Sequence, residues 1–547
     1  MLKRPVRQFT APSAMLFAAA GMLALTQGCP APAPEIKKVE PPVKPEPPKS
    51  EDLSFDLEEV KLAGTLFVPA GFGFPGMVRV VPKGKVTLEK QRKTFAKAKA
   101  NRKSAEAQVL VTLLWDKSKE LAQIDKATTA ALREETRKVL QDTQAMLGDQ
   151  VDAVILQMLF TVNMWLGDDA AAIAAGSELM TRFADSGIAS QLAPWVAYLE
   201  LKNWQTAEAA AITAGWTLDD PKMDYLHAYV MAWASFRQRN YDAARAAIIW
   251  AARNWKSKAT QGTVEQDLFL MLGRSGAPIE EAASLFAELT VGDTKTQAIW
   301  LFSLYSNYEA TGYEALAAQA LEQTLTVAGD AATPQEKLSV RQRQSTKYLF
   351  ANQPGEAADA AIDAYENLRA CGAPCESLTG DLADHLTRLS SFFHTTYSVT
   401  LDDRHYAAAK KIYDYYLTLN RPDAEKLRGY LGRLEETKQR AAPGTGKHDA
   451  DTMSLLLGFR NQAVKGCYEG VLQSEPELKG SLQMTLSIKE NGEVTGVATD
   501  PATGDAGLAA VAGCVEERAR TWALPTRKVP GTTTVKRSYL LEPQPQQ

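Results

Sequence analysis

The sequence predicts a mostly α-helical protein in which a long α-solenoid is followed by a small C-terminal α+β domain of order α-β-β-α-β. Two observations predict this fold. Pairs of a bulky or turn residue and a small residue three places later recur between residues 150 and 441, and the hydrophobic period changes from helical to alternating after residue 452. Of the 547 residues, 45 % are hydrophobic and 23 % are charged, and the net charge is −4. This composition excludes a wholly disordered chain, a collagen and a polytopic membrane protein, and it gives no sign of a nucleic-acid-binding domain.

Residues 1–28 are typical of a lipoprotein signal peptide. Three basic residues in the first seven positions precede an uncharged apolar run at 14–25, which is too short to span a bilayer. The run leads into Leu-Thr-Gln-Gly-Cys, which resembles a bacterial lipobox and implies that Cys29 is lipidated and becomes the first mature residue. Because Pro30 rather than an aspartate follows it, the resemblance implies a lipid-anchored, periplasm-facing protein of the outer membrane. The alternative is an ordinary signal peptide followed by a chance cysteine.

Residues 29–52 are expected to form a Pro-rich tether. Eight of the 27 prolines lie at positions 30–49, interleaved with Glu and Lys. Such a segment cannot bury apolar area, and it extends by about 3.1 Å per residue as polyproline II. The tether would hold the body of the protein away from the membrane.

Residues 53–149 are expected to contain short strands followed by long helices from residue 89. The segment Gly71–Gly76 formally matches a dinucleotide-binding fingerprint, but the strand expected at 77–81 stands where that motif needs a helix. Seven Lys and Arg residues crowd positions 90–103. They form a solvated helix face or, as the alternative, contact an anionic envelope polymer such as peptidoglycan.

Residues 150–441 carry the repeat, whose positions follow one another at 35, 37, 38, 34, 41 and 52 residues. The positions are Asp169, Trp204, Tyr241, Ile279, Tyr313, Pro354 and Tyr406. A period in the mid-thirties with two helices per unit resembles tetratricopeptide repeats, and the sequence QRNYDAA at 238–244 is similar to the loop consensus of that family. The resemblance implies a solenoid whose concave surface binds peptides or partner proteins and whose Trp and Tyr residues lie in the core.

After a linker at 442–452, residues 453–547 form the small domain. We expect a helix at 453–474, two strands joined by an Asn-Gly turn at 480–499, a helix at 505–521 and a strand at 533–541. The pattern resembles the TonB-like C-terminal domain found in envelope and adventurous-gliding proteins of myxobacteria. The residues that carry this resemblance are Cys467, Tyr468, Leu472, Pro476, Leu478, Gly480, Leu486, Ile488, Gly492, Val494, Cys514, Val515, Trp522, Pro525 and Val535.

The cysteines are expected to pair, because an exported protein lies in an oxidising compartment. In the domain identified by this resemblance, one cysteine in each helix implies a disulfide between Cys467 and Cys514. Cys371 and Cys375 are expected to form a local disulfide across a short turn, with a redox role as the alternative.

TonB-like domains accept a partner segment as an extra strand at an exposed sheet edge. The resemblance implies that the closing strand is this edge, with Val535, Lys536, Arg537, Ser538 and Tyr539 as the partner-binding residues. The alternative is that Lys536 and Arg537 only protect an edge from aggregation.

The sequence contains no His-Glu-x-x-His, Gly-x-Ser-x-Gly or Walker motif. We therefore expect no enzymatic activity, and no cofactor, metal or nucleic acid as a ligand. The lipobox, the repeats and the terminal domain together resemble a tetratricopeptide-repeat lipoprotein of the myxobacterial adventurous gliding-motility machinery. This resemblance implies a scaffold that binds envelope proteins in a trans-envelope complex. The alternatives are an accessory of TonB-dependent transport or secretion, and an activator of a peptidoglycan enzyme.

Overall fold

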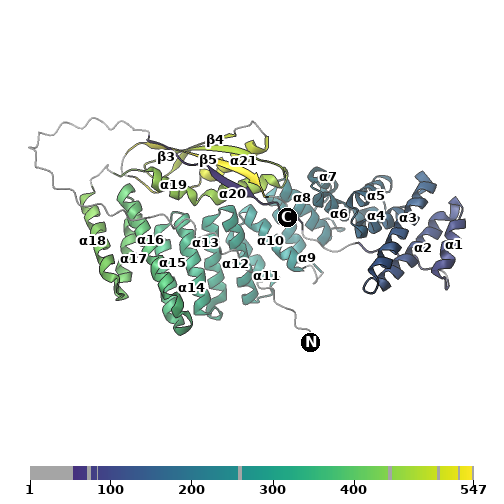
Figure 1. Ribbon diagram of the computed structural model, residues 1–547, viewed down its shortest axis with the longest axis horizontal. Coiled ribbons are helices and arrows are strands. Elements are labelled where there is room, and N and C mark those ends of the chain that lie inside the picture. The colour runs from purple at the N-terminus through teal and green to yellow at the C-terminus, as the bar shows by residue number, and fades with distance from the viewer. Residues whose placement is uncertain are drawn as a thin grey trace, which may run out of the picture. The chain divides into compact units, whose positions relative to one another are not determined.

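The computed structural model describes residues 53–69, 75–82, 84–256, 261–441, 446–501, 506–527 and 530–544. The expected signal peptide, Cys29, the tether and most of the Gly71–Gly76 motif lie outside the described residues. Residues 49–547 form one compact unit. Figure 1 shows its two parts, an array of paired helices and a small sheet domain beside that array.

The helical array accounts for most of this unit. Its N-terminal helices are α1 (Leu88–Lys97), α2 (Ala100–Leu121) and α3 (Lys126–Leu147), followed by the 3-10 turn η1 (Gly148–Gln150). Helix pairs then follow in chain order: α4 (Ala153–Leu166) and α5 (Asp169–Arg182), α6 (Gly187–Lys202) and α7 (Thr206–Thr213), α8 (Tyr225–Arg237) and α9 (Tyr241–Asn254), α10 (Gln261–Ser275) and α11 (Ile279–Leu289), α12 (Thr294–Thr311) and α13 (Glu314–Ala328), α14 (Pro334–Phe350) and α15 (Pro354–Cys371), and α16 (Thr379–Thr400) and α17 (Asp403–Thr418). Two further 3-10 turns, η2 (Gly329–Ala331) and η3 (Ala373–Leu378), lie between pairs, and α18 (Ala424–Arg440) ends the array. Helices that are close in this order also pack together, which is the arrangement of an α-solenoid.

The sequence repeat marks the turns within these helix pairs. One or two residues after the first helix of each pair ends, a residue takes a left-handed φ of 55 to 77°. These residues are Gly167, Trp204, Arg239, Gly276, Gly312, Asn352 and Leu401. A left-handed residue stops a helix because its amide turns back towards the carbonyls of the last turn. Every expected repeat position lies within five residues of such a turn.

Small residues allow the two helices of a pair to approach closely. Five of the expected small residues are almost fully buried, namely Ala172, Ala244, Ala282, Ala357 and Ala409. Ala207 is exposed and Leu316 only partly buried, and the nearby Ala209 and Ala317 are the buried residues in those two pairs. The expectation that the aromatic residues lie in the core holds for Trp300, whereas Trp204 and Tyr241 are only partly buried.

The sheet domain follows the array. Its elements are α19 (Ala450–Gly458), α20 (Asn461–Leu472), β3 (Gly480–Lys489), β4 (Val494–Pro501), α21 (Ala506–Ala519) and β5 (Thr532–Pro543). The single helix expected at 453–474 is therefore two helices, which are separated at Phe459 and Arg460. The first of them begins at Ala450, inside the expected linker.

The sheet also contains two strands from the other end of the chain, β1 (Leu53–Asp56) and β2 (Val60–Gly64). The strand order is β1-β5-β3-β4, and β2 also pairs with β5. Both N-terminal strands run parallel to β5, with Leu53 opposite Thr533 and Val60 opposite Tyr539. Figure 1 shows the purple strand beside the yellow β5. These strands thus belong to the C-terminal sheet rather than to a region formed with α1–α3.

The expectation that the closing strand is an exposed edge is wrong. Strand β5 has β3 on one side and β1 and β2 on the other, so Val535–Tyr539 lie in the interior of the sheet. The outer strands are β4 on one side and β1 and β2 on the other. The expected alternation is present, because Val535, Arg537 and Tyr539 are buried while Lys536 is exposed.

Residues 77–81 are not a strand. Met77 is buried with the core residues of the N-terminal helices, and the Val80 N–H donates to Thr112 Oγ1 of α2 at 3.0 Å. A membrane-spanning candidate, which needs both length and apolar composition, is not found among the described helices.

Candidate functional site

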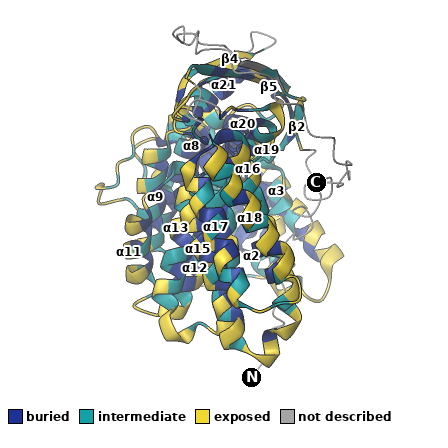
Figure 2. Cartoon of the chain, turned by 90° about the vertical axis from the view of Figure 1, so that its left-hand side faces the viewer, coloured by how far each residue is buried: buried dark blue, intermediate teal, exposed yellow. Residues whose placement is uncertain are grey.

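The sheet domain is docked on one edge of the array, along the row of turns within the helix pairs. We call this contact the docking seam. Its array side comprises Tyr241, Arg274, Thr311, Tyr313, Phe350 and Thr400–Asp402. On the domain side, α20 lies between the sheet and the array helices (Figure 2). The pairs from α8 and α9 to α16 and α17 contribute to the seam because the repeat brings their turns to the same edge.

At the centre of the seam the backbones of α12 and α20 approach closely. A Cβ atom at Gly312 would lie 2.5 Å from Ala463 N, and one at Gly466 would lie 3.0 Å from Thr311 O. Arg518 of α21 donates to the same Thr311 carbonyl. Gly312 has a second reason to be glycine, since its φ is +75°.

The break between α19 and α20 places an aromatic side chain on the array. The ring of Phe459 stacks on Phe350 with 4.2 Å between the centroids, and Phe392 lies 6.3 Å away. Stacked apolar rings at this distance contribute both buried area and aromatic attraction to docking.

Asp402 links the two parts at one end of the seam. Its carboxylate accepts the Thr526 N–H of the sheet domain at 3.0 Å and the Arg404 guanidinium at 2.7 Å, and His405 Nδ1 lies 3.5 Å away. Burial opposes ionisation, but the adjacent His405 ring and the hydrogen bonds from Arg404 hold the pKa of Asp402 far below its ordinary value. The side chain is therefore a carboxylate at neutral pH.

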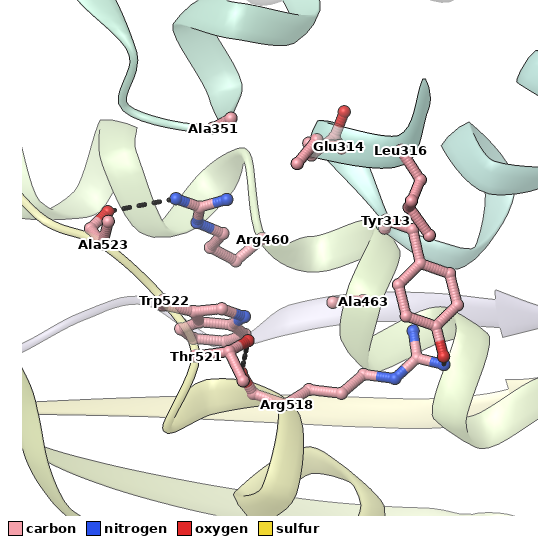
Figure 3. A pocket seen from close by; sticks show the side chains of 12 residues that line it. Tyr313, Glu314, Leu316, Ala351, Arg460, Ala463, Arg518, Thr521, Trp522 and Ala523 are labelled. Carbon is pink, nitrogen blue, oxygen red and sulfur yellow. Dashed lines mark hydrogen bonds between the residues drawn. The ribbon is translucent and has the colours of Figure 1, made fainter. Parts of the chain in front are cut away.

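A cavity of about 190 Å³ lies within the seam (Figure 3). Tyr313, Arg460, Arg518 and Trp522 are among the residues that line it. Arg518 donates to Tyr313 Oη at 3.2 Å, and Arg460 donates to Ala523 O at 3.1 Å. Burial lowers the pKa of Arg460 to about 10. Arg518 bonds to Thr311 and Tyr313 of the array and therefore serves the contact between the sheet domain and the array. The Arg460 bond lies within the sheet domain.

Residues 53–69, which we call the strap, cross the sheet domain and reach the array. Leu62 of β2 is buried in the sheet-domain core with Tyr468. Gly64 packs on α20 so closely that a Cβ atom would overlap Leu472 and lie 2.7 Å from the Tyr468 ring. Lys61 forms an ion pair with Glu542 of β5 at 2.6 Å.

Beyond β2, Glu469 of α20 and Gln473, which directly follows this helix, hold the main chain of the strap. Glu469 Oε1 accepts the Thr65 N–H at 3.1 Å, and Gln473 Oε1 accepts the Phe67 N–H at 3.0 Å. The amide group of Gln473 also donates to Thr65 O at 3.3 Å. Glu469 and Gln473 are 3 % and 1 % exposed. Helix α20 thus binds an extended backbone through its peptide groups.

Phe67 of the strap lies against two buried arginines of the array. The Arg274 guanidinium is 4.7 Å from the centre of the Phe67 ring and forms a buried ion pair with Glu469 at 2.7 Å. Arg237 donates to the carbonyl groups of Leu201 and Phe67, and burial lowers the pKa of Arg237 to about 10. The strap therefore contacts the sheet, α20 and the array.

The structure contains the two expected disulfides. Cys467 of α20 is joined to Cys514 of α21, and Cys371 is joined to Cys375, with Cα–Cα distances of 5.7 and 5.8 Å. The first pair ties the seam helix α20 to α21 of the sheet domain.

Several basic residues at 90–103 have partners within the chain. Arg92 pairs with Glu135 at 2.6 Å, and the buried Lys103 donates to Phe95 O at 3.1 Å. These pairs favour an ordinary helix surface over a polymer-binding site. Among the described residues no cluster of His, Cys, Asp and Glu could hold a metal ion.

Sequence reasoning missed the strap and the residues that hold it. Alternating apolar residues at 53–64 indicate strands, but the local sequence does not show that these strands pair with β5. It also missed His448, which lies in the expected linker at 442–452. This side chain is buried and contacts Thr533 Oγ1 at 3.0 Å and Pro525 O at 2.9 Å.

Comparison with known proteins yields no family model and no curated protein that matches this chain. Among solved structures it is similar to a circular tandem repeat protein with novel repeat topology and enhanced subunit contact surfaces. The identity is 15 % over 71 % of this chain and 90 % of the other, with a TM-score of 0.17. A likeness of this size carries no argument about function.

Proposed function

We propose that the chain is a non-enzymatic, lipid-anchored scaffold of the outer membrane that joins envelope proteins into a trans-envelope complex. In this proposal the array is of the tetratricopeptide type and the terminal domain is TonB-like, and the complex serves gliding motility. The observation that carries the proposal is the docking seam. It holds a helical repeat array and a small sheet domain, two folds that commonly bind polypeptides, in one compact unit.

Two further features support an anchored, exported scaffold. The lipobox-like sequence ends at Cys29, and the Pro-rich segment at 30–49 separates it from β1. Both disulfides are of a kind that persists in an oxidising compartment. In the anchored protein a pull on the tether would reach the strap first, since β1 begins directly after the tether.

Replacement of the anchoring thiol tests the proposal. We expect Cys29→Ser to move the protein from the membrane fraction to the soluble periplasm, because a serine cannot receive the lipid. The neighbouring Pro30→Ala is the matched control and should leave the protein in the membrane. Membrane retention of purified Cys29→Ser protein, mixed with vesicles and without partners, would contradict a lipid anchor.

The same variant tests the assignment to motility. A strain carrying Cys29→Ser should lose gliding to the same extent as a strain that lacks the protein. Normal gliding with defective TonB-dependent uptake, or with a weakened cell wall, would instead favour one of the two alternative functions.

A further inference from the structure

The strap contacts a surface that extends over two parts of the molecule, which we call the groove. The groove begins at the side of β5 that pairs with β1 and β2, continues over Glu469 and Gln473, and ends at Arg237 and Arg274 of the array. In Figure 2, β2 lies beside β5 and α20 at the top of the array helices. The groove is thus formed by the chain and filled by another part of the same chain.

The groove recognises its occupant mainly through the main chain. β5 supplies a parallel ladder to Val60–Gly64, and the side chains of Glu469 and Gln473 bond the peptide groups of Thr65 and Phe67. Peptide groups are common to all sequences, so other extended segments can make the same bonds. The aromatic ring of Phe67 is the feature of the strap's end that selects a sequence, since it faces the Arg274 guanidinium.

The groove carries charges of both signs along the strap. Glu542 of β5 forms an ion pair with Lys61 of the strap. At the other end, Arg237 and Arg274 lie beside Phe67, and Arg274 also pairs with Glu469. The groove therefore selects its occupant by the aromatic residue rather than by net charge.

The strap is held by short strands and by no covalent cross-link. Its strands have 4 and 5 residues and are interrupted at Leu57–Glu59. Neither disulfide involves the strap. Short strands at the side of a sheet can open in local steps, below the free energy of global unfolding.

We propose that the strap is a displaceable pseudo-ligand, and that the groove binds an extended segment of another envelope protein with an aromatic residue three positions beyond its strand. The strap competes for the groove in cis, and a pull on the tether removes it. This inference rests on the proposed scaffold function for the source of the partner. Every chain in the binding test below carries Cys29→Ser, and wild type there means a chain without a further change, so a failure of lipid anchoring leaves the outcome unaffected.

Peptide binding tests the groove. The probe is a fluorescent peptide of residues 53–69, added to the full chain and followed by anisotropy. A tethered strap competes at an effective concentration in the millimolar range, so the wild-type chain should bind the peptide weakly. Phe67→Ala in the chain loosens the strap and should strengthen peptide binding about tenfold or more. Val68→Ala is the matched control, because Val68 is 60 % exposed, and it should bind like wild type.

The peptide itself supplies the converse test. A peptide carrying Phe67→Ala should bind the Phe67→Ala chain about tenfold more weakly than the unchanged peptide. Equal binding of both peptides, or equal binding to all three chains, would overturn the proposal. A wild-type dimer that is lost with Phe67→Ala would assign the groove to the strap of a second copy and would also overturn it.

Hydrogen exchange on the wild-type chain covers the case in which the variant fails to fold. Amides at 60–67 should exchange at least tenfold faster than those of β3 (Gly480–Lys489). Equal exchange would mean that the strap leaves only on global unfolding, and the groove would then be permanently closed.

Discussion

At the scale of the residue, the docking seam and the attachment of the strap both depend on buried polar groups whose partners lie in another part of the chain. Asp402 of the array accepts a main-chain N–H of the sheet domain at Thr526, which is 124 positions away. Gln473 binds peptide groups of Phe67 and Thr65 in the strap, which lie 406 and 408 positions earlier in the sequence. A buried group that loses its partner costs more than the bond itself contributes, so these links specify one docked geometry.

Neutralising Asp402 should weaken the seam. We expect Asp402→Asn to lower the free energy of unfolding by about 2 kcal/mol at pH 7, because it replaces charge-assisted hydrogen bonds to Arg404 and Thr526. Denaturant unfolding measures the loss. The control is Asp384→Asn, which makes the same change at an exposed position on α16 and should cost less than 0.5 kcal/mol, a rough limit for surface sites.

The direction of the Asp402 pKa shift sets the pH dependence of this loss. The folded pKa lies below the ordinary value of 3.8, so the carboxylate contributes its full stabilisation above that value. This contribution decreases as the pH falls below about 4 towards the folded pKa. The difference between wild type and Asp402→Asn should therefore be constant from pH 5 to 7, a range of roughly full ionisation, and shrink on acidification. A difference that grew at low pH would contradict the charged state of Asp402.

At the scale of the element, the helices and the strand alternation were predictable, and their partners were not. The mid-thirties period marks the turns of the helix pairs because each turn needs its own left-handed residue and a small contact residue nearby. The alternation within Val535–Tyr539 was also correct, but the position of β5 in the sheet was not. Alternation tells which side chains face the core, whereas an edge depends on whether another strand exists, and here that strand lies at 53–64.

The close contact between α12 and α20 can be tested at one glycine. Gly312→Ala should lower the free energy of unfolding by about 3 kcal/mol, of which about 1 comes from the positive φ and about 2 from the collision with the Ala463 backbone. Gly167 is the matched control, because it also follows the first helix of a pair, has a φ of +77° and has no atom within 4 Å of an added Cβ. Gly167→Ala should lose only about 1 kcal/mol. Equal losses would mean that α20 is not held against α12.

The two disulfides should differ in their contribution to stability. The Cys467–Cys514 bond has a sequence separation of 47 and the Cys371–Cys375 bond one of 4. On the chain-entropy estimate they stabilise by about 4 and about 2 kcal/mol. The double variant Cys467→Ala, Cys514→Ala should therefore unfold at lower denaturant concentration than Cys371→Ala, Cys375→Ala. The reverse order would show that the local bond at 371–375 matters more than the bond between α20 and α21.

At the scale of the whole molecule, the array and the sheet domain are one unit because their contacts join positions far apart in the sequence. Composition and period predicted two kinds of fold along the chain, with a linker between them. They could not predict that the linker region is partly buried at His448 or that the sheet rests on the turn row. Both features arise from close backbone approach at glycines and from single polar contacts, which leave no periodic trace in a sequence.

The pairing of β1 and β2 with β5 also fixes the order in which the protein can be completed. A chain is synthesised from its N-terminus, so the first strands emerge before their partner, which lies some 480 positions later (Leu53 opposite Thr533). The array can form from local contacts in the meantime, whereas the sheet must wait for the last strand and for the closure of a very long loop. Until then the strands at 53–64 remain available to neighbouring chains. Completion of the sheet is therefore the slowest step in the folding of this protein, and the step before which the unpaired strands are exposed.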